Sequence, residues 1–311
     1  MHAVTLESVP SAPAVAEVDT PRPEAGELLV KVAVASLNGI DIATAAGYTQ
    51  AFMEHRFPLV LGQDFAGTVE ALAEGVEGFA VGDVVFGVVM KPFLGAGSLA
   101  QYVTVPAGHG VARIPAGVTT GDAGALGVAG VTAQVSLDAV ALAEGETVLI
   151  SGASGGVGAL AVQLAAARGA TVIATARPGA QADFVTGLTD AAVHVVDFTG
   201  DLQAQVRTIA PDGVDTVLHL AGDGAALAAL LRPGGRLASA TGLSQDDVKD
   251  HDVTVHTIMS APDAKILTSL AEQVAAGALR VPVTATYPLE QATQAFAAFA
   301  GTPGKITVSC S

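Results

Sequence analysis

The sequence predicts an α/β protein with two parts, a mainly β region and a doubly wound parallel sheet. In the first hundred residues, short strand-like runs alternate with turns. From about Asp122, strand-like runs alternate instead with helices rich in alanine and leucine. Residues 146–158 have the sequence ETVLISGASGGVG, an apolar β-branched strand that leads through a glycine-rich turn into a helix.

The mainly β region is predicted from short apolar runs with breaks such as Val81-Gly82-Asp83 between them. The expected strands include 27–35, 66–71, 84–89 and 101–105. This spacing favours an irregular β domain of barrel type. Beyond about residue 260 the pattern predicts a helix at 264–276, a strand at 281–287, a helix at 289–300 and a strand at 305–308.

The parallel sheet is predicted from the alternation of strands and helices after Asp122. The expected strands are 147–150, 171–174, 192–196, 216–220 and 236–240. Crossover helices between parallel strands produce this alternation in doubly wound sheets.

The glycine-rich turn predicts a dinucleotide site. A tight turn from a strand into a helix directs unpaired backbone N–H groups at one point, and glycines let a phosphate approach them. The motif is AxGxxG at Ala153, Gly155 and Gly158, so alanine replaces the first glycine of the usual fingerprint. The predicted cofactor-binding residues of the turn are Gly152, Ala153, Ser154, Gly155, Gly156, Val157 and Gly158.

The end of the second strand indicates which dinucleotide binds. No acidic residue follows Thr171–Ala174, and Arg177 does. An acidic residue there favours NAD, whereas arginine can bind the 2′-phosphate of NADPH through two hydrogen bonds. We therefore predict NADPH, the alternative being that Arg177 is a solvated loop residue. Later strand ends add Leu220, Ala221, Ala240 and Thr241 as predicted contacts, the alternative being ordinary packing of strand ends.

Charge and composition exclude several classes of protein. The net charge of −16, from 30 acidic and 14 basic residues, disfavours binding to nucleic acid or to anionic membranes. No apolar run is long enough to cross a bilayer, and the N-terminus lacks the pattern of a signal peptide. The single cysteine, Cys310, fits a reducing compartment. We expect a cytoplasmic protein.

The order of motifs resembles the medium-chain dehydrogenase/reductase superfamily, in its zinc-independent quinone oxidoreductase branch. The resemblance rests on the segments SLNGID (36–41), GQDFAG (62–67), VGDVV (81–85), GVAGVTA (127–133), SGASGGVG (151–158), RPGGR (232–236) and GKI (304–306). It implies a GroES-like, mainly β catalytic domain built from residues 1–121 and 262–311, with a Rossmann domain at 122–261. It also implies an active site in the cleft between them, a nicotinamide contact at Thr132, and a homodimer.

The resemblance also allows a test for zinc. Zinc-dependent relatives hold their catalytic metal with Cys, His and Cys, and the matching positions here are Asn38, Gln63 and Val128. An amide is a poor zinc ligand and valine cannot ligate at all. A structural site of four cysteines is impossible with one cysteine. We therefore predict that no metal takes part.

Without a metal to polarise it, the substrate must itself be electron-poor. The predicted function is NADPH-dependent reduction of quinones or activated α,β-unsaturated carbonyls by hydride transfer. Asn38 and Tyr48 are the predicted catalytic residues, as hydrogen-bond donors to the developing oxyanion. Tyr48 could equally line the cleft wall, and Asp41 and Asp64 are expected to have structural roles. The alternatives are an enoyl-thioester reductase and a non-catalytic NADPH-binding regulatory protein.

Overall fold

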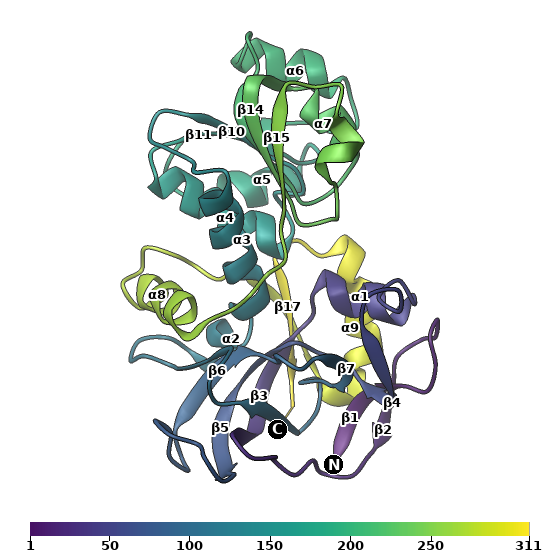
Figure 1. The fold of residues 1–311 in the computed structure, drawn as a ribbon. Coiled ribbons are helices and arrows are strands. Elements are labelled where there is room, and N and C mark those ends of the chain that lie inside the picture. The colour runs from purple at the N-terminus through teal and green to yellow at the C-terminus, as the bar shows by residue number, and fades with distance from the viewer. Residues whose placement is uncertain (311) are drawn as a thin grey trace. The chain divides into compact units, whose positions relative to one another are not determined.

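The computed structural model describes residues 1–310 and divides into two compact units (Figure 1). The terminal unit comprises Met1–Val131 together with the C-terminal segment from Ala261, and the central unit comprises Thr132–Ser260. The first boundary lies inside α3 (Gly127–Ala139), later than the predicted boundary at residue 122. The reason is that α2 (Thr120–Ala123) contacts strands of the terminal unit and Gly124 packs against Val34.

The central unit contains a parallel sheet with the strand order β12-β11-β10-β13-β14-β15. The strands are β10 (Thr147–Ile150), β11 (Thr171–Thr175), β12 (Val193–Val196), β13 (Val214–His219), β14 (Leu231–Ser239) and β15 (Val253–Thr257). The chain builds the sheet outward from β10 in both directions, which is the doubly wound arrangement that the sequence predicts. In such sheets ligands bind beyond the carboxyl ends of the strands, where the winding reverses.

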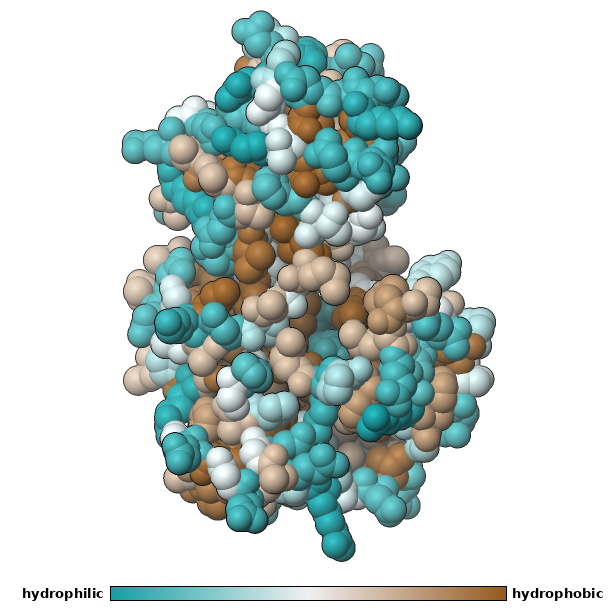
Figure 2. Space-filling view, in the orientation of Figure 1, coloured by the Kyte–Doolittle hydropathy of each residue, from teal (hydrophilic) through white to brown (hydrophobic). Residues whose placement is uncertain are grey.

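Helices connect the parallel strands. They are α4 (Gly156–Ala167), α5 (Ala180–Thr186), α6 (Leu202–Ile209) and α7 (Gly224–Ala228), and a 3-10 turn, η1 (Gln245–Val248), precedes β15. The core between sheet and helices includes Leu149, Ile173, Val217 and Leu237, all fully buried. Figure 2 shows a mainly hydrophilic surface over α6 and α7.

The terminal unit contains a seven-stranded sheet in which the C-terminal strand lies beside β3. The order is β16-β17-β3-β5-β6-β9, and β8 also pairs with β3. The strands are β3 (Glu27–Ser36), β5 (Asp64–Leu72), β6 (Val84–Val88), β8 (Tyr102–Pro106), β9 (Val111–Arg113), β16 (Val283–Pro288) and β17 (Lys305–Ser309). Antiparallel pairing of β17 with β3 sets Thr307 opposite Ser36. Residues from both ends of the chain therefore meet inside this sheet.

A second sheet of the terminal unit has the order β2-β1-β4-β7. Its strands are β1 (His2–Leu6), β2 (Ala14–Glu17), β4 (Glu54–Val60) and β7 (Phe93–Ala96). None of these four strands was named from the sequence. They are short or partly polar, and β4 contains Pro58, which lies where the register of the β4–β7 pair shifts.

The helices of the terminal unit complete its core. Besides α2, they are α1 (Gly39–Ala45), α8 (Ala264–Ala275) and α9 (Ala292–Ala298). The predicted helix at 289–300 is α9 with 3-10 turns at its two ends, η2 (Leu289–Gln291) and η3 (Phe299–Gly301). Among residues 1–310, no helix is both long and apolar enough to span a bilayer.

Candidate functional site

The glycine turn joins β10 to α4 through a tight backbone arrangement. Gly152 has a φ of +70°, a left-handed conformation that other residues adopt only with strain. The Gly155 N–H donates to the Gly152 carbonyl at 3.0 Å. A Cβ on Gly158 would lie 2.3 Å from the Gly152 oxygen and 2.6 Å from the Ala153 Cα. Gly158 is therefore required for the helix to pass so close to the turn.

The beginning of α4 fits a phosphate group. Gly155 is the N-cap and provides no side-chain hydrogen bond to the N–H groups of the first turn. Only one atom, the Gly152 oxygen at 3.4 Å, would lie within 4 Å of a Cβ on Gly155. A ligand can therefore approach the backbone closely at this residue. Unpaired N–H groups and the positive end of the helix dipole attract anions. These residues fit the pyrophosphate of a dinucleotide.

Two hydroxyl groups fix the turn to the neighbouring strand ends. The Ser151 hydroxyl accepts hydrogen bonds from the N–H groups of Leu220 and Ala221, at 3.0 and 3.3 Å. The Thr175 hydroxyl, at the end of β11, accepts from the Gly152 N–H at 3.0 Å. The structure thus brings the predicted residues Leu220 and Ala221 beside the glycine turn.

The ends of β13 and β14 are joined through a histidine. The Ala240 N–H donates to the His219 carbonyl at 3.1 Å, and the Thr241 hydroxyl lies 3.1 Å from the His219 ring nitrogens. The ring also bonds to the Ser239 hydroxyl and the Gly222 carbonyl, each at 3.1 Å. His219 is buried, so its role here is to hold these strand ends together.

Arg177 follows β11 and is exposed. Its guanidinium carbon lies 5.5 Å from the ring centroid of Phe198, which follows the neighbouring strand β12. Its positive charge, together with hydrogen bonds from Thr199, holds the pKa of Asp197 below its usual value, the Thr199 bonds being the larger cause. Arg177 forms no salt bridge with any residue in the range 1–310.

Thr132 is the first residue of the central unit and is buried within α3. Its contact with a nicotinamide stays a prediction. Phe198 was not among the residues predicted from the sequence. The signal that could have found it was an aromatic residue placed two positions after the end of a parallel strand.

The terminal unit contains a buried polar cluster of Ser36, Asn38, Asp41, Asp64 and Lys305, each less than 9% exposed. Four secondary-structure elements supply these residues. Ser36 ends β3, Asn38 precedes α1, Asp64 begins β5 and Lys305 begins β17. Asp41 lies within α1. The pairing of β3 with β5 and β17 brings them together from distant parts of the chain.

Asp64 is the acceptor at the centre of this cluster. One of its oxygens, Oδ2, accepts from the Ser36 hydroxyl at 2.7 Å, the Asn38 amide at 2.9 Å and the Lys305 ammonium at 3.3 Å. The other, Oδ1, accepts from the Val128 N–H at 2.6 Å. A Cβ on Gly127 would lie 2.6 Å from that oxygen, so the first turn of α3 packs directly on the carboxylate.

The Lys305 ammonium has an acceptor for each of its three hydrogens. These acceptors are the Leu37 carbonyl at 3.0 Å, the Asn38 side-chain oxygen at 2.7 Å and Asp64 at 3.3 Å. A buried ammonium needs such partners to compensate for lost hydration. From the sequence, Lys305 was part of a family motif only, with no role predicted for its side chain.

Asp41 connects α1 to the turn before β5. Its oxygens accept from the Asn38 N–H at 2.9 Å and the Gly62 N–H at 3.0 Å. Burial, helped by the negative charge of Asp64, raises the pKa of Asp41 to about 7 against the opposing effect of these hydrogen bonds. Asp41 and Asp64 therefore both have the structural contacts expected of them.

The contacts of Asn38 differ from those expected of a substrate donor. Its amide nitrogen donates to Asp64 at 2.9 Å and to the Ser36 carbonyl at 3.4 Å, so both hydrogens already have acceptors in the protein. Its oxygen accepts from Lys305. In this arrangement Asn38 bridges an ammonium and a carboxylate, and no amide hydrogen is left over for a substrate.

The same contacts bear on metal binding. Of the three positions matched to zinc ligands, Asn38 has its oxygen bonded to an ammonium and Val128 has no ligating atom. Gln63 offers only a neutral amide, and a cation would meet the positive charge of Lys305. Within residues 1–310, no three His, Cys, Asp or Glu side chains lie together as a metal site would require. This donor set does not fit zinc.

Tyr48 lies in the turn that follows α1, and its side chain is 76% exposed. Its backbone N–H donates to the Ala43 carbonyl at 2.9 Å, which fixes the turn. Phe52, on the same segment, is 67% exposed. The phenol is thus accessible to solvent and to a ligand, and its catalytic role stays a prediction.

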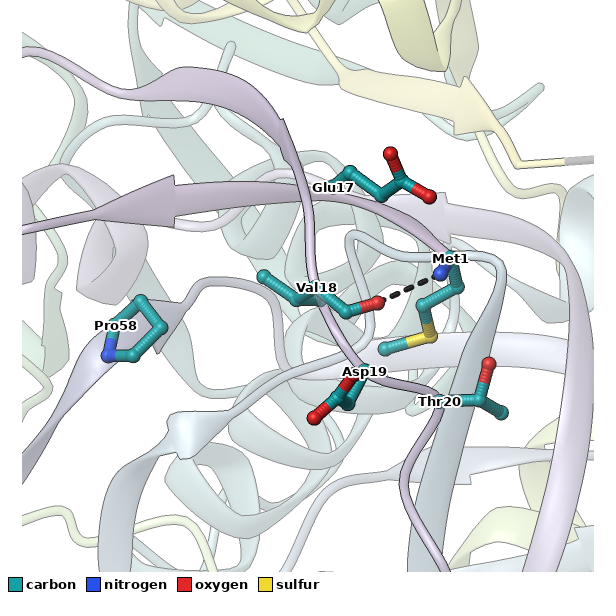
Figure 3. Close-up of a pocket in the computed structure, with 6 residues that line it drawn as sticks. All are labelled: Met1, Glu17, Val18, Asp19, Thr20 and Pro58. Atoms are coloured by element: carbon teal, nitrogen blue, oxygen red, sulfur yellow. Dashed lines mark hydrogen bonds between the residues drawn. The ribbon is translucent and has the colours of Figure 1, made fainter.

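A shallow, open cavity of about 630 Å³ lies elsewhere in the terminal unit, beside β1 and β2 (Figure 3). It is lined by Met1, Glu17, Val18, Asp19, Thr20 and Pro58, and the N-terminal ammonium donates to the Val18 carbonyl. None of the predicted site residues lines this cavity. Its two carboxylates would repel the phosphates of a dinucleotide, so it does not fit the cofactor.

Known protein families match both ends of the chain. The model of the alcohol dehydrogenase GroES-like domain matches residues 24–116, and that of the zinc-binding dehydrogenase matches residues 191–308. A chloroplastic quinone-oxidoreductase homolog from Spinacia oleracea is 36% identical over 65% of this chain, which spans 62% of that protein's length. Acryloyl-coenzyme A reductase from Metallosphaera sedula is 30% identical over 70% of each chain.

Solved structures share the fold over the whole chain. The quinone oxidoreductase from Coxiella burnetii superposes with a TM-score of 0.88 at 25% identity, covering 100% of this chain and 99% of its own. A mycobacterial protein solved in complex with NADPH gives a TM-score of 0.86 at 27% identity, covering 99% of each chain. The predicted GroES-like and Rossmann folds are confirmed.

Proposed function

The chain belongs to the quinone oxidoreductase branch of the medium-chain dehydrogenase/reductase superfamily, and we propose that it reduces quinones or activated α,β-unsaturated carbonyls with NADPH, without zinc. One observation supports this proposal above all others. The end of β11 carries an exposed arginine with no salt bridge to any residue from 1 to 310, next to a glycine turn open to phosphate.

We assign the cofactor by matching the two positively polarised groups of the site to the two phosphate-bearing parts of NADPH. The N–H groups at the start of α4 bind the pyrophosphate, and Arg177 binds the 2′-phosphate. The acidic side chain that would select NADH is missing after β11. A relative in complex with NADPH supports the same assignment. When bound, the reduced nicotinamide supplies a hydride.

The substrate class follows from the buried polar cluster. Because Asn38 and Lys305 bond to each other where zinc relatives bind metal, the protein offers no Lewis acid there. A simple ketone would then stay unactivated. A quinone or a conjugated carbonyl carries its own electron-withdrawing group and accepts a hydride without metal assistance.

For the proton, we propose the phenol of Tyr48, which is exposed and can donate to an oxyanion. Asn38 then acts as a positioning residue, since its hydrogens are already donated to Asp64 and to the Ser36 carbonyl. The Tyr48→Phe variant tests the donor. We expect turnover to fall at least about tenfold with little change in the Kd for NADPH, measured by stopped-flow and by fluorescence titration. Full turnover in this variant would remove Tyr48 as the acid.

A second candidate function is the reduction of an enoyl thioester. The similarity to acryloyl-coenzyme A reductase favours it, because an enoyl thioester is also a conjugated carbonyl. A coenzyme A substrate carries phosphates, however, and this chain has a net charge of −16. Turnover of acryloyl-CoA measured beside a quinone and a simple enone separates the two functions. A chain that oxidises NADPH with none of them would instead be a non-catalytic NADPH-binding protein.

The cofactor preference is tested with Arg177→Ala. A charge-assisted hydrogen bond contributes about 1.5–3 kcal/mol, so NADPH affinity should fall about 10- to 100-fold while NADH affinity stays the same. Both dissociation constants are measured by fluorescence titration of the full chain. Arg207→Ala, which removes a partly exposed arginine of α6, is the control and should change neither constant. Equal losses for both cofactors in Arg177→Ala would contradict the assignment.

A further inference from the structure

We propose that Phe198 determines the strength of the NADPH preference by holding the Arg177 guanidinium in position for the 2′-phosphate. The proposal rests on the cofactor site proposed above and adds a specificity-determining residue to it. Phe198 is a positioning residue here, because it acts through Arg177.

The two residues occupy equivalent places on neighbouring strands. Thr175 of β11 pairs with Val196 of β12 in parallel register, and the Ala176 N–H donates to the Val196 carbonyl at 3.0 Å. Arg177 and Phe198 each lie two positions after this pair. Their side chains meet at the carboxyl edge of the sheet, with the guanidinium carbon 5.5 Å from the ring centroid. This is within the range of a cation–π interaction.

The backbone that carries Phe198 is fixed on both sides. The Gln205 side chain, from α6, accepts from the Asp197 N–H at 2.8 Å and donates to the Asp197 carbonyl at 2.9 Å. The Asp197 carboxylate accepts from the N–H and the hydroxyl of Thr199, at 2.9 and 2.7 Å. These four bonds hold the backbone of the turn at 197–199, from which the Phe198 ring projects toward the guanidinium.

Core packing does not account for an aromatic side chain at position 198. The Phe198 side chain is 44% exposed, although a large apolar group is stabilised by burial. The Arg177 side chain has no acceptor for its guanidinium hydrogens among residues 1–310, so all five remain available to a phosphate. An arginine already held against a ring loses less conformational entropy on binding than one that moves freely.

The electrostatic surroundings favour the same arrangement. The charge of Arg177 helps to lower the pKa of Asp197, so the two groups attract each other without forming a bonded pair. The guanidinium thus lies over an aromatic ring and is attracted by a carboxylate that already accepts two hydrogen bonds from Thr199. A 2′-phosphate, with nearly two negative charges at neutral pH, is a much stronger partner for Arg177 than this carboxylate.

The test uses ligands that contain only the adenosine end of the cofactor. Adenosine 2′,5′-bisphosphate and adenosine 5′-monophosphate are titrated into the full chain by calorimetry. In Phe198→Leu, we expect affinity for the bisphosphate to fall about threefold and affinity for the monophosphate to stay the same. Phe198→Tyr keeps the ring and should keep both affinities. In an Arg177→Ala background, Phe198→Leu should change neither affinity, because the guanidinium is already gone.

Phe79→Leu is the matched control. It removes a similar contact, with the Arg113 guanidinium 5.1 Å from the ring, in the terminal unit. It should leave both affinities unchanged. Equal losses of both ligands in Phe198→Leu would mean that the ring stacks on the adenine itself, and no loss would mean that the contact is incidental. Either result overturns the proposal while leaving the NADPH assignment intact. A wild-type protein that binds both ligands equally would overturn the cofactor assignment as well.

Discussion

The two units of this protein use charged side chains in opposite ways. In the terminal unit, Lys305 and Asp64 are almost completely buried, and each hydrogen of the ammonium has an acceptor within the protein. In the central unit, Arg177 is exposed, and its guanidinium lies against the Phe198 ring without a hydrogen-bond acceptor among residues 1–310. The Lys305 charge is fully paired within the fold, whereas the Arg177 charge is exposed and is the one that we propose for ligand binding.

From this difference we expect the terminal cluster to matter for stability and Arg177 to matter for binding. A buried charge is costly without its partner, so removing either Lys305 or Asp64 should destabilise the fold. An exposed charge is solvated whether or not a ligand is present, so its removal costs the fold little. Substitutions in the terminal cluster should therefore change unfolding, and substitutions at the central site should change binding.

The largest effect on stability is expected from Lys305→Met. The substitution leaves the Asp64 carboxylate buried without its cation, and such a loss costs about 3–5 kcal/mol. The free energy of unfolding is measured by urea titration. Lys31→Met is the matched control, since Lys31 is an exposed lysine on β3, and should stay within about 0.5 kcal/mol of wild type. A Lys305 variant as stable as that control would contradict the expectation that the buried charges of the terminal unit stabilise the fold.

The pH dependence of stability is expected to contain a contribution from Asp41. Its pKa is raised from 3.8 to about 7 in the folded chain, so the folded state holds a proton that the unfolded state releases. Between these two values stability should fall as pH rises, by about 1.4 kcal/mol per pH unit from this group, and the contribution should level off above the folded-state value. Unfolding midpoints of wild type and Asp41→Asn are compared at several pH values. Parallel curves for the two proteins would contradict the assignment.

The smallest effect on stability is expected from Arg177→Ala. Its side chain is exposed and its contact with Phe198 is worth about 0.5–1 kcal/mol at most, so the unfolding midpoint should change little. The same variant should lose most of its affinity for NADPH. A large loss of stability in Arg177→Ala would mean that this arginine belongs to the fold, as Lys305 does.

Much of the fold follows from local patterns. Strand β10 begins and ends at the predicted residues, and the end of α8 differs from its prediction by a single position, because each has a clear apolar period and a distinct end. Strands β1, β2, β4 and β7 were not named from the sequence, because they are short or partly polar and are stabilised by pairing with one another. The local sequence of a strand does not show which distant strand it pairs with.

The candidate site likewise contains residues that the local sequence predicts and contacts that only the tertiary structure shows. Residues 152–158 and Arg177 were predicted because a glycine turn and the residue after a strand carry their chemistry in local sequence. The role of Lys305 was not predicted, since its partners Asn38 and Asp64 lie 267 and 241 positions away in the chain. The contact of Arg177 with Phe198 was also not predicted, because it depends on β11 and β12 being neighbours in the sheet.

By itself, the sequence determined an α/β unit and a mainly β unit, and it predicted a dinucleotide site and the lack of zinc ligands, because each of these depends on residue types and short spacings. Only the tertiary structure decided what the charged and polar groups do. It used both hydrogens of the Asn38 amide within the protein and left the Arg177 guanidinium exposed beside an aromatic ring. Hydrogen-bond partners and burial depend on which distant segments meet, and that is fixed only when the strands pair.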